Sequence, residues 1–154
     1  MGNVFKLQQP KCCMETGIKV GDIMKTSLVT INDSATIQEA AKIMKSKEIG
    51  SLLVKDKNKK IYAILTDRDL VEKAVAKGLK SNFKIATLVS KPLVGISPDS
   101  DISEAAKLMG NEDLRRLVVL REGKLIGILS EKDIVKISPS LYDLIAEKVE
   151  GHLR

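Results

Sequence analysis

The sequence contains the same pattern twice. Residues 28–44, LVTINDSATIQEAAKIM, resemble residues 93–109, LVGISPDSDISEAAKLM. Residues 51–71, SLLVKDKNKKIYAILTDRDLV, resemble residues 116–135, RLVVLREGKLIGILSEKDIV. The second copy lacks one residue in a polar turn, where loops absorb changes of length. A repeat of this kind predicts two structural units of the same fold.

The repeat divides the chain into four segments. A hydrophobic content of 44 % in 154 residues supports a folded interior. We expect a flexible leader, a first repeat, a second repeat and a C-terminal helix, at residues 1–17, 18–80, 81–137 and 138–154 respectively.

Each repeat contains an amphipathic helix. Apolar side chains recur at intervals of three and four residues, which places them on one helical face. Thr36 with Glu39, and Asp101 with Glu104, have the spacing at which side chains cap a first turn. The apolar residues are Ile37, Ala40, Ala41 and Met44 in the first repeat, and Ile102, Ala105, Ala106 and Met109 in the second.

The other apolar runs are short and predict strands. In the first repeat we expect a strand at residues 28–31, a hairpin of residues 51–54 and 61–65, and a second helix at residues 67–77, ended by Gly78. The equivalents in the second repeat are residues 93–96, 117–120 and 125–129, and a helix that begins at Glu131 and stops before Pro139. The predicted order in each repeat is β-α-β-β-α, which defines an α/β (α+β) fold.

The last segment has the pattern of a further amphipathic helix. Pro139 is acceptable in a first helical turn, and Leu141, Leu144, Ile145 and Val149 then share one face. Such a stripe needs a covering surface. We expect the first repeat or a second subunit to cover it.

Composition argues against several classes of function. No apolar run approaches the roughly 18 residues of a membrane helix, so we expect no membrane partner and a cytoplasmic location. The adjacent Cys12 and Cys13 and the sole histidine, His152, are too few for a four-ligand zinc site. They also provide no plausible Cys-His or Ser-His-Asp set. We therefore expect no metal, no catalytic cofactor and no enzymatic activity.

The net charge of +6 favours an anionic partner. Nucleotides, nucleic acid and an acidic protein face all satisfy this condition. The chain has no Trp, two Tyr and two Phe, so it offers few platforms for stacking unpaired bases. We do not expect nucleic acid to be the principal partner.

A hydroxyl residue precedes an aspartate by three positions in both repeats. Thr66 with Asp69, and Ser130 with Asp133, have the spacing of a capping box, with Asp in place of Glu or Gln. The same residues can also form a ligand site, because a helix N-terminus favours an anion and a carboxylate accepts hydrogen bonds from a ribose diol. Arg68 and Lys132 lie between the two residues and can reach a phosphate.

These motifs together resemble a tandem pair of CBS domains, the cystathionine β-synthase type repeat. The resemblance covers about residues 20–136 and includes DIM, TIQEAAKIM, the hairpin and GILSEKDIV. It implies two repeats packed through their sheets with pseudo-two-fold symmetry. It also implies two clefts that bind AMP, ADP, ATP or S-adenosylmethionine as regulatory ligands, and association into a homodimer.

The resemblance also implies roles for individual residues. Asp69 and Asp133 would hold ribose hydroxyls, and Thr66 and Ser130 would hold phosphates with Arg68 and Lys132. Each cleft would draw on both repeats, with Asp133 facing the first and Asp69 the second. The adenine would lie near Leu28, Val29, Ile49 and Gly50, or near Leu93, Val94, Leu114 and Arg115.

The two copies differ beside the predicted clefts. Ala63 stands where the second repeat has Gly127, a position that in relatives gives backbone room beside the ligand. Arg115 and Arg116 add charge that can favour a polyphosphate or pair with nearby carboxylates.

Three functions agree with these observations. The first is a stand-alone sensor that binds an adenine nucleotide, or S-adenosylmethionine or a related nucleoside, and modulates an unidentified partner protein. The second is a ligand-free structural module for dimerisation or docking, in which the Thr/Ser-x-x-Asp residues act only as caps. The third is a nucleic-acid accessory protein. We favour the first.

Overall fold

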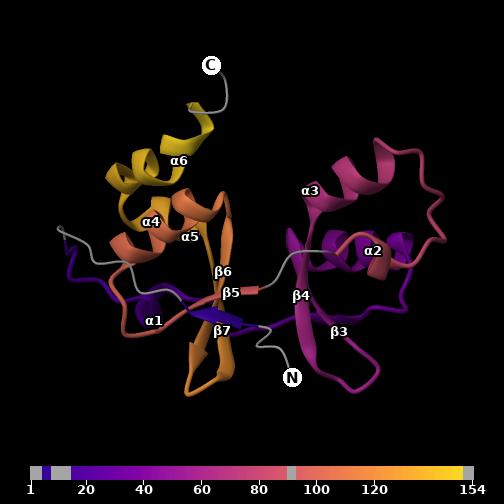
Figure 1. Ribbon diagram of the computed structural model, residues 1–154, viewed down its shortest axis with the longest axis horizontal. Helices are drawn as coiled ribbons and strands as arrows, with labels where there is room; N and C mark the ends of the chain where they lie inside the picture. Colours follow the sequence, from indigo (N-terminus) through magenta and orange to yellow (C-terminus); the bar gives the residue numbers. More distant parts are fainter. Residues whose placement is uncertain (1–4, 8–14, 90–92, 151–154) are drawn as a thin grey trace. The chain divides into compact units, whose positions relative to one another are not determined.

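The computed structural model describes residues 5–7, 15–89 and 93–150, with side chains from residues 15–89 and 93–146. The chain divides into two compact units (Figure 1). The N-repeat unit comprises Leu28–Leu93. The C-repeat unit comprises residues 94–150 together with the earlier residues 5–7 and 15–27.

The N-repeat unit is built on a three-stranded sheet of order β2-β3-β4. The short strand β2 (Thr30–Asn32) is parallel to β3 (Ser51–Lys55), which forms an antiparallel hairpin with β4 (Ile61–Thr66). Buried Ile31, Leu52, Val54 and Leu65 join the helices in one apolar core.

Helix α2 (Ile37–Lys47) begins where the capping pattern predicts. Thr36 Oγ1 accepts a hydrogen bond from the Glu39 N–H at 3.2 Å, and Glu39 Oε2 accepts one from the Thr36 N–H at 2.7 Å. Ile37, Ala40 and Met44 are buried, whereas Ala41, which was expected on the same face, is exposed. One covered side of this helix therefore holds it on the sheet.

The second helix of the N-repeat unit changes its winding. It starts as α3 (Asp67–Asp69) and continues as a π-helix over Leu70–Val75, where the Ala76 N–H donates to the Val71 carbonyl. Gly78, with a φ of 67°, follows where the sequence predicted the stop. A short 3-10 helix at Ile85–Thr87 completes the unit.

The C-repeat unit repeats this plan with additions. Strands β5 (Leu93–Ile96), β6 (Arg116–Arg121) and β7 (Lys124–Ser130) correspond to the three strands of the N-repeat unit. Strand β1 (Phe5–Leu7), from the segment predicted to be a leader, extends the order to β1-β5-β6-β7. Helices α1 (Val20–Ile23), α4 (Ile102–Glu112) and α5 (Glu131–Ile137) accompany this sheet. The predicted α+β fold class and the β-α-β-β-α order of both repeats are confirmed.

Residues 15–27 are attached to the C-repeat unit through Asp101, the N-cap of α4. Its carboxylate accepts hydrogen bonds from the N–H and hydroxyl of Thr16, from the Gly17 N–H, and from the N–H and hydroxyl of Ser103, all at 2.8–2.9 Å. Burial raises the pKa of Asp101, but the hydrogen bonds from Ser103 and Thr16 outweigh it and lower the pKa to about 2. The capping residue that the sequence predicted therefore also forms hydrogen bonds with residues far away in the sequence.

The C-terminal segment forms a 3-10 turn at Pro139–Leu141 and helix α6 (Tyr142–Glu150), which packs on α4 and α5. Leu141 and Ile145 are buried in the core of the C-repeat unit, with Leu144 beside them. The expectation that the first repeat or a second subunit covers this stripe was wrong for these three residues, because the second repeat covers them. The side chain of Val149 lies outside the described side chains.

Candidate functional site

Thr66 and Asp69 form a closed turn where β4 passes into α3. Thr66 Oγ1 accepts a hydrogen bond from the Asp69 N–H at 3.1 Å, and Asp69 Oδ2 accepts bonds from the Thr66 N–H at 2.9 Å and its hydroxyl at 2.8 Å. The other carboxylate oxygen, Oδ1, lies 2.8 Å from Nζ of Lys73, which also donates to the Leu88 carbonyl at 2.9 Å. Burial raises the pKa of Asp69, but the hydrogen bonds from Lys73 and Thr66 outweigh it and the pKa lies below its ordinary value. Asp69 is therefore an anion at neutral pH.

Ser130 and Asp133 form the same turn between β7 and α5. Asp133 Oδ2 accepts hydrogen bonds from the Ser130 N–H at 3.0 Å and its hydroxyl at 2.6 Å, and Ser130 Oγ accepts one from the Asp133 N–H at 3.3 Å. Oδ1 again has an ammonium partner, Nζ of Lys25, at 3.4 Å. Asp133 is buried, whereas the Lys25 side chain is 65 % exposed. A ligand that displaces or joins Lys25 would therefore meet a carboxylate already held in position.

In both turns, the two oxygens of the aspartate carboxylate have different partners. Oδ2 completes the helix cap, and Oδ1 binds a lysine. A carboxylate oxygen accepts more than one hydrogen bond, so Oδ1 has capacity for a hydroxyl group such as that of a ribose. The lysine adds a positive charge suited to a phosphate. The capping interpretation of the repeated motif is confirmed, and the ligand interpretation stays a prediction.

The cationic side chains beside the turns differ in their contacts and exposure. Arg68 Nε donates to Glu72 Oε1 at 2.5 Å, so this side chain lies along its own helix. Arg115 Nη1 lies 3.8 Å from Glu131 Oε1, and Lys132 is exposed. To reach a phosphate, Arg68 would have to leave Glu72.

Two predicted adenine-binding segments adjoin these turns. The Gly50 carbonyl accepts a hydrogen bond from the Asp67 N–H at 3.0 Å, and the Arg115 carbonyl accepts one from the Glu131 N–H at 2.9 Å. Each segment is thus fixed to the first residue of a helix that carries a predicted ribose-binding aspartate. Both bonds lie within one repeat, so they do not test the expectation that Asp69 faces the second repeat and Asp133 the first.

The other predicted adenine-binding residues are apolar and partly or fully buried. Ile49 and Val29 pack against the core of the N-repeat unit, and Leu114 against that of the C-repeat unit. Leu28 is half-buried, and Leu93 and Val94 are buried. The expectation that each cleft draws on both repeats stays a prediction.

Gly127 provides space for the polypeptide that carries Lys25. A β-carbon at this position would lie 2.6 Å from Met24 Sδ and 3.2 Å from the Lys25 carbonyl oxygen. The Lys25 and Ile128 backbones exchange two hydrogen bonds of 2.9 Å beside it. Close approach of residues 24–25 to β7 is therefore a physical reason for glycine here.

Sequence reasoning did not assign Lys25 or Lys73 to the sites. Lys73 carries a usable signal, because it lies four residues after Asp69 on the same helix. Lys25 carries none, because only the fold brings it to Asp133.

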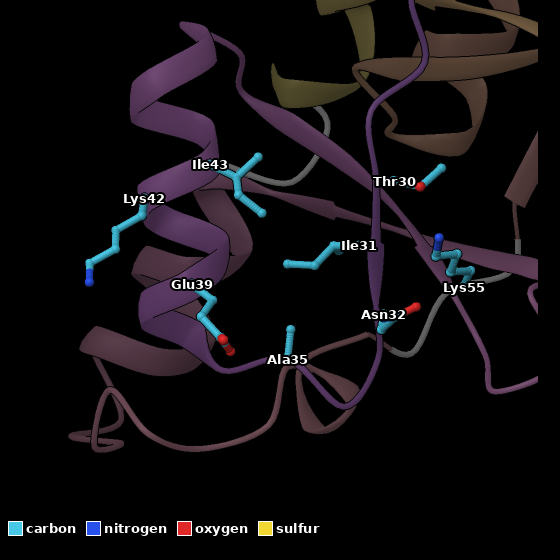
Figure 2. A pocket seen from close by; sticks show the side chains of 8 residues that line it. All are labelled: Thr30, Ile31, Asn32, Ala35, Glu39, Lys42, Ile43 and Lys55. Atoms are coloured by element: carbon cyan, nitrogen blue, oxygen red, sulfur yellow. The ribbon is translucent and has the colours of Figure 1, made fainter.

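A pocket of about 480 Å³ lies elsewhere in the N-repeat unit (Figure 2). It opens between β2 and α2, and none of the predicted nucleotide-binding residues lines it. The duplicated turns remain the stronger indication of a nucleotide site, because the pocket contains none of the residues that form them.

Within the described residues, no cluster of three or more His, Cys, Asp or Glu side chains is placed to hold a metal ion. Cys12, Cys13 and His152 lie outside the described residues. None of the described helices combines the length and apolar character needed to cross a membrane.

Comparison with known proteins identifies the family. A family model for the CBS domain matches residues 20–76 and 85–140, which is most of the chain. The chain belongs to the CBS domain family, as the repeated motifs indicated. It carries two such domains in tandem.

Solved structures support the same assignment. The crystal structure of a conserved CBS domain protein from Thermoplasma acidophilum has a TM-score of 0.75 and 25 % identity, over 83 % of this chain and 74 % of that one. The hexameric CBS-CP12 protein from bloom-forming cyanobacteria has a TM-score of 0.72 and 29 % identity, over 87 % of this chain and 81 % of that one.

Among curated proteins, the CBS domain-containing protein YhcV of Bacillus subtilis is 33 % identical over 79 residues, which is 51 % of this chain and 56 % of the relative. This chain spans about half the length of the first curated relatives that it matches.

Proposed function

We propose that the protein is a regulatory module that binds an adenosine nucleotide, AMP, ADP or ATP, and thereby modulates a partner protein. The main support is the duplicated turn in which a hydroxyl and a carboxylate meet at the start of a helix, with a lysine on the carboxylate oxygen that the cap does not use. Membership of the CBS family adds support from resemblance. The proposal assigns no reaction to the chain.

Each residue has a defined role in this proposal. Asp69 and Asp133 accept hydrogen bonds from ribose hydroxyls. Thr66 and Ser130 redirect their single hydroxyl hydrogens from these carboxylates to phosphate oxygens when the nucleotide binds. Lys25 and Lys73 join Arg68 and Lys132 as the cations that favour a phosphorylated ligand. The adenine contacts remain those proposed from the sequence: Leu28, Val29, Ile49, Gly50, Leu93, Val94, Leu114 and Arg115.

Regulation requires that the ligand bind two states of the module with different affinity. The proposed readout is association, either of two copies of this chain as a homodimer or of this chain with the regulated protein. The hexameric assembly of the cyanobacterial relative shows that one CBS protein self-associates. Sedimentation of this chain with and without nucleotide tests this part of the proposal.

A ligand-free structural module is the second candidate. It is favoured by the completeness of both caps, in which each aspartate already has hydrogen-bond partners and a lysine. In that case the aspartates would stabilise helices and bind nothing.

Isothermal titration calorimetry separates the candidates. Nucleotide-stripped protein is titrated with AMP, ADP, ATP and S-adenosylmethionine at low and high salt. Saturable binding of a phosphorylated nucleotide supports the proposal. Binding of S-adenosylmethionine alone would replace the ligand class, and no binding to any of the four would favour the structural module. A duplex oligonucleotide that binds with strong salt dependence would favour the nucleic-acid alternative.

A further inference from the structure

The two aspartate turns differ at the position four residues after the aspartate. In the first repeat this residue is Lys73, and in the second it is Ile137, which is 51 % exposed. Side chains four residues apart on a helix are neighbours. The first repeat therefore places an ammonium group beside Asp69 from its own helix, whereas Asp133 is paired with Lys25 from an earlier part of the chain.

Lys73 is held on both sides. Its Nζ lies 2.8 Å from Asp69 Oδ1 and donates to the Leu88 carbonyl at 2.9 Å. Only 29 % of the Lys73 side chain and 21 % of the Asp69 side chain are exposed, so water and salt screen this pair less than a surface pair. A ribose hydroxyl that binds Oδ1 must therefore share this oxygen with the ammonium group or displace the lysine from both partners.

The pairing of Asp133 is weaker. Nζ of Lys25 lies 3.4 Å from Asp133 Oδ1, whereas charge-assisted hydrogen bonds are about 2.7–2.9 Å long. The Lys25 side chain is 65 % exposed, and exposed ion pairs of this kind contribute little. A ligand hydroxyl can therefore bind this Oδ1 without breaking a strong bond, while Ser130 holds the other oxygen in place.

We infer that the two nucleotide sites are unequal: the Asp133 site binds first, and Lys73 weakens the Asp69 site by competing with the ribose for Oδ1. This inference rests on the proposed function and adds to it an order of occupation. The charge of Lys73 still favours a phosphate, so the competition concerns the ribose hydroxyls. The two sites then fill over different ranges of nucleotide concentration, which gives the module two separate responses.

Titration of AMP into isotope-labelled full-length protein tests the order. The backbone amides of Asp69 and Leu70 report on one site, and those of Asp133 and Ile134 report on the other. We expect the Asp133 site to reach half-saturation at an AMP concentration at least about fivefold lower than the Asp69 site, a difference of about 1 kcal/mol.

Adenosine tests the role of Lys73, because it carries the ribose without a phosphate. Lys73→Ile gives the first repeat the residue of the second, and should increase the affinity of the Asp69 site for adenosine at least about threefold. Lys77→Ile is the matched control, since it removes the same charge from an exposed position after the helix. The control should bind adenosine as the parent does.

The reciprocal variant transfers the competitor to the second repeat. Ile137→Lys places an ammonium group four residues after Asp133, at an exposed position that tolerates the change. It should decrease the affinity of the Asp133 site for adenosine at least about threefold and leave the Asp69 site unaltered. This variant keeps the test decisive if Lys73→Ile does not fold.

The inference alone is overturned if AMP binds the two sites equally or binds the Asp69 site more tightly. It is also overturned if either folded exchange variant leaves the adenosine affinity of its own site unchanged, or if Lys77→Ile has the same effect as Lys73→Ile. Absence of saturable AMP shifts at both turns would instead overturn the proposed nucleotide function together with this inference.

Discussion

The carbonyl oxygen of Leu144 in α6 occupies the space that a β-carbon on Gly110 of α4 would fill. The two helices therefore touch backbone to backbone. The first repeat has Lys45 at the equivalent position of α2, where it is exposed. Gly110 thus distinguishes α4, which α6 covers, from α2, its counterpart in the first repeat.

Gly110→Ala should destabilise the protein although alanine favours a helix. The gain in helix propensity is about 1 kcal/mol, but the methyl group would force α6 away from α4 and expose Leu141 and Ile145. We expect a net loss of about 1–3 kcal/mol, as for other overpacked sites, measured by urea unfolding. Lys45→Ala is the control and should have little effect. A Gly110→Ala protein as stable as the parent would contradict the close packing.

Asp101→Asn should lower stability at neutral pH and not in strong acid. The folded-state pKa of Asp101 is about 2, below its ordinary value of 3.8, so its stabilisation is present above pH 4 and disappears as the pH falls through 2. The shift corresponds to about 2 kcal/mol. The amide also places N–H donors against those of Thr16 or Gly17.

The measurement is urea unfolding of Asp101→Asn and the parent protein at pH 7, 5, 3 and 2. The difference in unfolding free energy should shrink through the last two values. A difference that is the same at pH 7 and pH 2 would show that the carboxylate charge is not the stabilising feature.

Gly127→Ala should weaken the packing of residues 24–25 on β7. The new methyl group would meet the flexible end of Met24, which can move, and the Lys25 carbonyl, which must shift. We expect a loss of about 1 kcal/mol. In the double variant with Met24→Ala, the loss of unfolding free energy should be smaller than the sum of the losses in the two single variants, because the residues share one contact. Full additivity would show that the two positions do not interact.

Much of this fold was predictable from the repeated sequence. Both hairpins and the first helix of each repeat follow from local signals, namely apolar periodicity and the capping residues Thr36 and Asp101. The capping turns at Thr66 and Ser130 were predicted in the same way. These features depend on residues close together in the chain, which is why a single sequence specifies them.

The features that the sequence did not predict depend on distant contacts. The apolar stripe of α6 can be recognised in the sequence, but the surface on which it packs depends on Gly110. This glycine stands where the first repeat has Lys45, and that difference was the signal present in the sequence. The attachment of residues 15–27 through Thr16 and Asp101 has no local pattern, and neither does the pairing of Lys25 with Asp133. The π-helical winding after Asp69 likewise has no signature that we identify in the sequence.

The nucleotide sites predict a specific contrast between two carboxylates with the same local role. Asp133 and Glu39 each close a capping box, but only Asp133 belongs to a proposed ligand site. Asp133→Asn should therefore weaken nucleotide binding, whereas Glu39→Gln should only reduce helix stability. Asp69→Asn should act on the other site in the same way as Asp133→Asn.

The most direct measurement is calorimetric titration of AMP, ADP and ATP into the parent protein, Asp69→Asn, Asp133→Asn and Glu39→Gln, with melting temperatures recorded for all four. We predict that each aspartate variant loses binding at one site by tenfold or more, about 1.4 kcal/mol, while Glu39→Gln binds as the parent does. Unchanged nucleotide affinity in both aspartate variants, or no binding by the parent, would contradict the proposal and leave these residues as helix caps.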